Sequence, residues 1–177
     1  MISLLSMTLL PQLATLFDPT TLSVHIIQGQ PLVAKKGKPG TWKLTPLENV
    51  WHKTEIDHFL AQLTRSIHEH PDSFMEIERK HSFVYQIGAY RIVVVLPPVS
   101  KLPEITIVKQ LVQLSIDKYE LTPDVLTYLL EQAKGIVIAG APGEGKSTFA
   151  QAFIAKLAEQ NVVIKTIEAP RDLIVPP

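Results

Sequence analysis

The chain has 177 residues, which is long enough for one ordinary domain or two small ones with a buried core. It contains no cysteine, which excludes disulfide frameworks, thiolate metal sites and cysteine nucleophiles and agrees with a reducing, cytoplasmic location. Seventeen basic and seventeen acidic residues cancel, so no whole-molecule charge attracts nucleic acid or an anionic membrane, although a local basic patch is still compatible with the sequence.

Residues 1–17 form an apolar segment without a charged side chain. A targeting segment or membrane anchor is one interpretation of this pattern. A signal peptide, however, needs a positive start and a small-residue cleavage site, and Pro11 interrupts the roughly 20 apolar residues that a membrane span needs. We therefore expect a buried or partner-facing segment and no membrane insertion.

The next part of the chain alternates between β-rich and irregular patterns. Leu22, Val24 and Ile26 predict a short strand that ends at Gly29. Residues 35–40 combine three lysines with glycine and proline and predict an irregular basic loop. A solvated loop is the favoured interpretation, since no aromatic residue is interleaved with the lysines. The alternative is a nucleic-acid contact through Lys35, Lys36 and Lys38.

Residues 54–67 predict an amphipathic helix, because apolar residues recur there at helical spacing. Thr54 and Asp57 resemble a capping box, and Pro71 disfavours any continuation of the helix. Histidines lie in or beside this helix, but no two of them stand four residues apart, as two helical zinc ligands would. We expect four solvent-side histidines, namely His52, His58, His68 and His70.

Three β-rich runs follow between residues 74 and 96, separated at residues 80–81 and 88–89, and they predict an antiparallel meander. Ile105 and Ile107 indicate a further strand. Arg91 begins the third run, and by residue type alone it is a surface or ion-pairing cation. Thr122, Pro123 and Asp124 then supply the cap, first residue and acid of a helix start, and this helix is expected to end at Gly135.

The segment that carries chemistry is the Walker A sequence of residues 140–147. Its glycines permit backbone conformations and a close approach to phosphate that a Cβ would hinder, so successive N–H groups can form an anion-binding nest. Lys146 would reach the β- and γ-phosphates of ATP, and the Ser147 hydroxyl would bind Mg²⁺. The residues expected to contact the cofactor are Gly140, Ala141, Pro142, Gly143, Glu144, Gly145, Lys146, Ser147 and Thr148.

The surroundings of this loop fit a βαβ unit. Residues 136–139 predict a strand before the loop, an amphipathic helix opens at Lys146, and residues 162–167 predict a second buried strand. A glycine turn without a ligand is the alternative. Glu168 lies just past the second strand, where it would orient water or hold metal, or else be merely solvated.

Several phrases of the sequence resemble the central part of the ATPases fused to PIN and KH domains, which are related to type II and type IV secretion ATPases. The phrases are FDPTTLSVHI (17–26), AKKGKPG (34–40), DSFMEIERK (72–80), YRIVVVLPP (90–98), GIVIAGAPGEGKSTFAQA (135–152) and KTIEAPRDL (165–173).

The resemblance implies an α/β architecture in which a small mixed α/β domain precedes the first part of a RecA-like P-loop NTPase domain. The expected divisions are an apolar segment at residues 1–17, the small domain at 18–118 and the P-loop domain at 119–177. The resemblance further implies homo-hexameric rings with ATP between subunits. It matches Glu168 to the acid of the family's Asp-box, and Arg91 to a small-domain arginine that approaches the nucleotide phosphates. Together with Lys146, these two residues form the expected catalytic set.

The sequence also departs from this family. Residues 1–17 contain none of the carboxylates that a PIN nuclease needs, and no Walker B strand, His-box or KH segment follows the loop. Later strands of a RecA-like sheet are therefore missing beside residues 136–139, whose backbone groups we expect to be partly unpaired. We expect an ATP-binding portion of a secretion-type ATPase that does not hydrolyse ATP alone. The alternative is a non-hydrolysing module that binds a nucleotide, nucleic acid or a ring.

Overall fold

The computed structural model describes residues 9–38, 41–69, 73–109, 114–141, 144–168 and 173. The chain divides into two compact units, Met1–Leu111 and Val112–Pro177. The architecture is mixed α/β, as predicted. The expected domain boundary between residues 118 and 119 stays a prediction.

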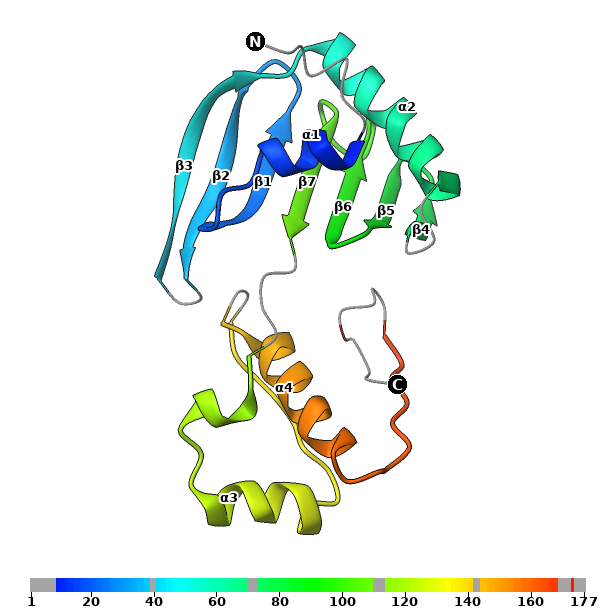
Figure 1. Ribbon diagram of the computed structural model, residues 1–177. Helices are drawn as coiled ribbons and strands as arrows, with labels where there is room; N and C mark the ends of the chain where they lie inside the picture. The colour runs from blue at the N-terminus through cyan, green and yellow to red at the C-terminus, as the bar shows by residue number, and fades with distance from the viewer. Residues whose placement is uncertain are drawn as a thin grey trace. The chain divides into compact units, whose positions relative to one another are not determined.

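A seven-stranded antiparallel sheet is the framework of the first unit (Figure 1). The predicted strand near residue 24, the meander of residues 74–96 and the strand near residue 106 are all confirmed. The spatial order is β3-β2-β1-β7-β6-β5-β4, so the last strand in the sequence pairs with the first. The strands are β1 (Thr21–Ile27), β2 (Pro31–Lys38), β3 (Thr41–Val50), β4 (Ser73–Arg79), β5 (Ser82–Ile87), β6 (Tyr90–Val95) and β7 (Glu104–Lys109).

Helices α1 (Leu9–Thr15) and α2 (Lys53–Glu69) cover one face of this sheet (Figure 1). The predicted apolar stripe of α2 packs into the core, where Phe59 meets Trp51 with ring centroids 5.1 Å apart. Leu9 and Leu13 of α1 are buried in the same core, so the part of the N-terminal segment that the structure describes is buried, as expected. Over the described residues, no helix combines the length and apolar character needed to cross a bilayer.

The cap of α2 differs from the prediction. The His52 N–H donates to Glu55 Oε2 at 3.0 Å, which caps the helix two residues earlier than the expected pair of Thr54 and Asp57. Asp57 instead forms an ion pair with Lys53. The capping-box prediction was wrong because acids lie at both residue 55 and residue 57, and only residue 55 has the spacing to reach the first free N–H.

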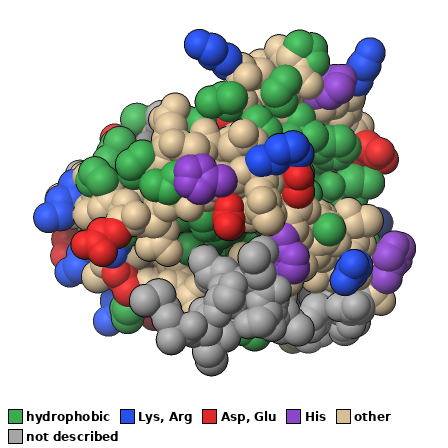
Figure 2. Space-filling view, turned by 90° about the horizontal axis from the view of Figure 1, so that it is seen from above, with side chains coloured by type: hydrophobic (Ala, Val, Ile, Leu, Met, Phe, Trp, Pro, Cys, Tyr) green, Lys and Arg blue, Asp and Glu red, His purple; other side chains and the backbone are tan. Residues whose placement is uncertain are grey.

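The histidines do not form a metal site in the part of the chain that is described, where no group of three or more metal-ligating side chains occurs. His52 and His68 are exposed as expected, whereas His58 is half-buried and corrects the prediction for that residue. His70 lies outside the described residues. Figure 2 shows one face of the molecule, on which basic, acidic and histidine side chains are interspersed.

Residues 35–38 correct the prediction of an irregular loop, because β2 continues through them to Lys38. Gly37 has φ 133°, and a Cβ at this position would lie 2.6 Å from the Thr41 carbonyl oxygen. It pairs with Trp42 of β3. The composition of this segment predicts a break, but pairing with β3 supplies the hydrogen bonds of a strand. Gly37 permits this pairing because it has no Cβ that would meet the Thr41 carbonyl. Residues 39 and 40 lie outside the described residues.

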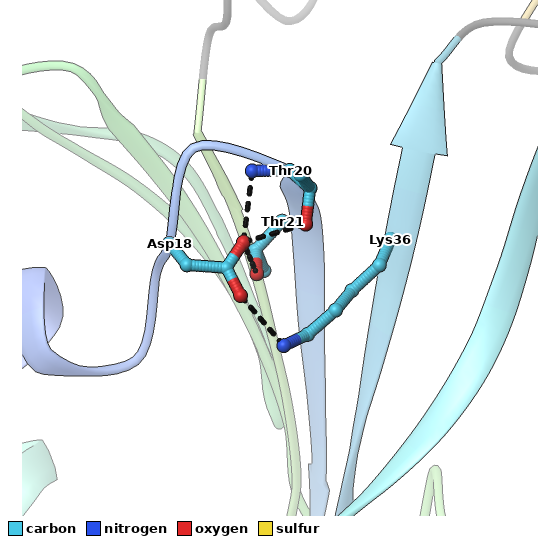
Figure 3. A network of polar contacts seen from close by, with 4 residues as sticks. All are labelled: Asp18, Thr20, Thr21 and Lys36. Atoms are coloured by element: carbon cyan, nitrogen blue, oxygen red, sulfur yellow. Dashed lines mark hydrogen bonds and ion pairs between the residues drawn. The ribbon is translucent and has the colours of Figure 1, made fainter.

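Asp18 fixes the start of β1 to its neighbour β2 (Figure 3). Its carboxylate accepts from Lys36 Nζ at 2.7 Å, from the Thr20 N–H at 2.8 Å and from the hydroxyls of Thr20 and Thr21. These donors, Lys36 foremost, hold the pKa of Asp18 below its usual range. One of the lysines of the predicted basic loop is thus engaged within the fold.

The second unit contains a small helical cluster. Its elements are η2 (Ile116–Tyr119), α3 (Pro123–Thr127), the π-helical turn η3 (Tyr128–Gln132) and α4 (Lys146–Ala158). The predicted helix start is confirmed, because the Thr122 hydroxyl accepts from the Val125 N–H at 3.4 Å. The helical conformation ends at Gln132, before the predicted end at Gly135. Its last turn, η3, is π-helical and has a different hydrogen-bond register from α3.

The two strands predicted around the Walker A loop are not formed. Residues 136–139 and 162–167 have no strand pairing, and Val137 and Val163 are 93% and 88% exposed. The strand prediction was wrong for both segments, because a strand needs a neighbour for its N–H and C=O groups and an apolar pattern does not supply one. Within the described residues, no strand lies beside either segment.

Candidate nucleotide site

Helix α4 positions the Walker A loop. Gly145 is its N-cap with φ +84°, a left-handed conformation that glycine adopts without strain, and Lys146 is the first helical residue. Further along α4, Ala152 and Phe153 are buried against Ile116 in a small core. The ring of Phe149 also meets Tyr119 edge to face, with centroids 4.9 Å apart. The start of α4 is thus anchored by packing within its own unit.

The side chain of Lys146 lies back over the loop. Its Nζ donates to the carbonyl oxygens of Gly140 and Ala141, both at 2.9 Å. Neither of these two contacts is with a carboxylate. The Lys146 ammonium group therefore lies beside the start of α4, where the end of the helix dipole is also positive.

Glu144 binds the backbone of the same loop. Its Oε2 accepts from the Ala141 N–H at 2.8 Å, and the Glu144 N–H donates to the Ala141 carbonyl at 3.3 Å. The Ala141 N–H thus already donates to an anionic oxygen, as a phosphate-binding N–H must. A Cβ on Gly140 would lie 2.9 Å from Glu144 Oε2, so a side chain at this position would displace the end of the flexible Glu144 side chain.

The donor set fits a nucleotide triphosphate with Mg²⁺. The loop offers N–H groups, an ammonium group and a helix start, which together suit phosphate oxygens. Ser147 is exposed in the first turn of α4 and Thr148 is half-buried beside it. Mg²⁺ retains most of its waters, so one hydroxyl is a sufficient protein ligand. Pro142 and Gly143 lie outside the described residues.

The remaining predicted site residues lie elsewhere. Glu168 accepts from the Leu173 N–H at 2.8 Å in the second unit. Arg91 lies on β6 of the first unit, paired in register with Gln86 and Val108. Since Tyr90 and Ile92 are buried in the core, alternation places Arg91 on the sheet face opposite to α1 and α2. The hydrogen bonds of the loop thus unite Gly140, Ala141, Glu144 and Lys146, while Glu168 belongs to the second unit and Arg91 to the first.

Sequence reasoning missed Trp42. The pairing of β2 with β3 places this residue opposite Gly37, and Lys35 Nζ lies 3.9 Å from the centre of its ring. The alternation of Trp42 and Leu44 with polar residues was the available strand signal. It was obscured because Pro39, Gly40 and Pro46 punctuate the same stretch.

Comparison with solved structures places this arrangement in a known fold. Over 86% of its length, the chain matches 43% of a pilus retraction motor, PilT, solved with bound ADP, with a TM-score of 0.53 and 16% sequence identity. The fold is shared with a pilus motor. The predicted fold class, a small α/β domain followed by the first part of a P-loop ATPase domain, is confirmed.

Two relatives are much closer in sequence. The chain is 42% identical over 167 residues to the Holliday junction branch migration ATPase PINA of Sulfolobus acidocaldarius, covering 94% of this chain and 33% of that protein. It is 40% identical over 160 residues to a KH- and PIN-domain protein of Methanocaldococcus jannaschii, covering 90% of this chain and 25% of that protein. The chain spans between a quarter and a third of these relatives. No family model matches it.

Proposed function

We propose that the chain is the ATP-binding portion of a P-loop motor ATPase. The observation that carries this proposal is the set of contacts around Lys146, whose ammonium group lies on the loop carbonyls at the start of a helix. The similarity to an ATPase over 94% of the chain supports the same function. The alternative, a non-hydrolysing nucleotide-binding module, needs the same loop and differs in turnover.

Each residue of the loop has a role in this proposal. Lys146 exchanges its two carbonyl contacts for the β- and γ-phosphates, and the loop N–H groups from Gly140 to Gly145 bind phosphate oxygens. Ser147 holds Mg²⁺, with Thr148 next to it in the first turn. Bound Mg²⁺ would neutralise charge that develops on the phosphates during transfer.

Glu168 and Arg91 are proposed to assist hydrolysis in the complete motor. A carboxylate can orient the attacking water, and an arginine can stabilise charge on the transferred phosphate. Both assignments follow from the resemblance of the sequence to secretion-type ATPases. The Glu168 carboxylate accepts a hydrogen bond from the Leu173 N–H, which restricts its orientation.

The work done by the whole protein is proposed from its relatives. One relative migrates Holliday junctions and the fold is shared with a pilus retraction motor, so both neighbours convert ATP into movement. We propose that this chain contributes to a motor of the same kind, assembled as a homo-hexameric ring and acting on branched DNA.

A titration with ATP tests the proposal. Lys146→Ala should weaken ATP binding by about ten- to hundredfold, because hydrogen bonds to charged groups contribute about 1.5–3 kcal/mol each. Ser147→Ala should weaken it in Mg²⁺ but not in EDTA. Lys134→Ala is the matched control, since it removes an exposed lysine from the same unit.

Two outcomes decide between the alternatives. Equal ATP affinities for the Lys146→Ala variant and the wild type would refute the assignment of the loop. Phosphate release from the isolated chain with MgATP would exclude the non-hydrolysing alternative, whereas binding without release is the result expected from either interpretation of the isolated chain.

A further inference from the structure

The outer end of the β2–β3 hairpin carries an aromatic side chain among lysines. Trp42 is 43% exposed and Leu44 is 58% exposed on β3, which forms one edge of the sheet. Strand pairing sets Trp42 opposite Gly37 and Leu44 opposite Lys35. Residues 35–38 of β2 contain no aromatic residue, and the pairing with β3 places Trp42 beside them.

The charges around Trp42 are positive. Lys35 Nζ lies 3.9 Å from the centre of the Trp42 ring, in a cation–π contact. Lys38 and Lys43 are exposed at the same end of the hairpin, where strand alternation places them on the other face of this edge from Trp42. Lys36 is held by Asp18. Residues 35–45 contain no acid. We call Lys35, Lys38, Trp42 and Lys43 the hairpin patch.

We propose that the hairpin patch binds single-stranded nucleic acid, with a base stacked on Trp42 and the lysines at the flanking phosphates. An exposed aromatic ring among cations is the arrangement by which proteins hold unpaired bases, and it needs no particular sequence. A paired duplex keeps its bases stacked on one another, so the ring selects for single strands.

A protein partner fits the patch less well. The exposed apolar surface here consists of two side chains, Trp42 and Leu44. Lys35 lies against the Trp42 ring, and Lys38 and Lys43 are exposed at the same end of the hairpin. The centres of protein interfaces are depleted in lysine and other charged residues. A polyanion gains from the same lysines that a protein interface would have to desolvate. The charge of the hairpin patch therefore favours nucleic acid.

Intrinsic fluorescence of the full chain provides a specific readout. The chain has two tryptophans, and Trp51 is 1% exposed in the core, so a stacked base quenches Trp42 selectively. We expect a short oligothymidylate to quench the fluorescence of the wild type and not that of Trp42→Phe. Trp42→Ala should weaken binding of a labelled oligothymidylate, followed by anisotropy, by about five- to hundredfold.

Salt dependence tests the lysines. Each phosphate neutralised on a single strand contributes about 0.7 to the slope of log affinity against log salt. Lys38→Ala with Lys43→Ala should therefore reduce the slope by about 1.4. Lys80→Ala, which removes an exposed lysine at the turn between β4 and β5, should leave the slope unchanged.

Three results would overturn the proposal. The first is equal oligothymidylate affinity for the wild type and Trp42→Ala, with thermal unfolding confirming that both are folded. The second is quenching by anionic lipid vesicles but not by the oligonucleotide. The third is a loss on Leu44→Ala as large as that on Trp42→Ala, which would indicate an apolar partner. Lys146→Ala should not change oligonucleotide binding, so the hairpin patch and the Walker A loop are tested separately.

Discussion

Glu144 introduces a negative charge into a loop that we propose to bind a polyanion. Its carboxylate occupies the Ala141 N–H at 2.8 Å, and Lys146 occupies the nearby carbonyl oxygens. ATP binding would have to displace both contacts. Glu144 should therefore weaken binding of the triphosphate in two ways. Its carboxylate competes with phosphate for the Ala141 N–H, and its negative charge repels the phosphates.

Glu144→Gln should strengthen ATP binding. An amide oxygen accepts a weaker hydrogen bond than a carboxylate by about 1 kcal/mol, which corresponds to about a fivefold gain in affinity. Glu131→Gln, at an exposed position of the same unit, is the control for the loss of one negative charge. Unchanged or weaker binding by Glu144→Gln would show that the Glu144 contact does not compete with phosphate.

At the scale of residues, the sequence predicted the features that depend only on the spacing of neighbouring residues. The Walker A spacing was enough to predict a helix that opens at Lys146, and α4 begins there. The hydrogen bond from Ala141 to Glu144 was not predictable, because it depends on how the loop turns back on itself. The ring contact of Trp42 with Lys35 was missed for a similar reason, since it arises from pairing between two strands.

At the scale of elements, Asp18 links two strands through a pH-dependent contact. Its pKa lies below the ordinary value in the folded chain, chiefly because of Lys36, so the carboxylate stabilises the fold above the unfolded pKa of about 4. This contribution is lost as the pH falls below that value. The pair is partly exposed, so salt should weaken it.

Asp18→Asn should therefore lower the melting temperature at pH 7 and have a progressively smaller effect between pH 4 and pH 2. Thermal unfolding followed by circular dichroism measures both. Asp57→Asn is the control, because Asp57 forms an exposed ion pair within a single helix. A difference between wild type and Asp18→Asn that stays constant with pH would contradict the role of the charge.

Elements held by local periodicity were predicted well, and elements that depend on distant partners were not. The apolar spacing of α2 and the β-rich runs of β5 and β6 are properties of contiguous residues. By contrast, β2 extends through Lys38 because β3 pairs with it, and residues 136–139 stay unpaired because no described strand lies beside them. In both segments the outcome depended on whether a neighbouring strand was present to pair with, and a local sequence pattern does not contain that information.

At the scale of the whole molecule, a net charge of zero conceals local differences. The hairpin patch is basic and the loop before α4 collects an ammonium group, while acids are spread over other elements. The fold class was predictable because family-like phrases occur along the chain. The order of strands was not, since the pairing of β1 with β7 joins segments about 80 residues apart.

The central claim, that residues 140–148 grip the phosphates of ATP, is tested most directly by amide NMR spectra of the isotope-labelled chain, whose mass is 19.7 kDa. On addition of MgATP, the amide signals of Ala141, Glu144, Gly145, Lys146 and Ser147 should shift, while those of the turn between β4 and β5 should not. Binding of ATP that shifts signals elsewhere and leaves these five unchanged would contradict the account.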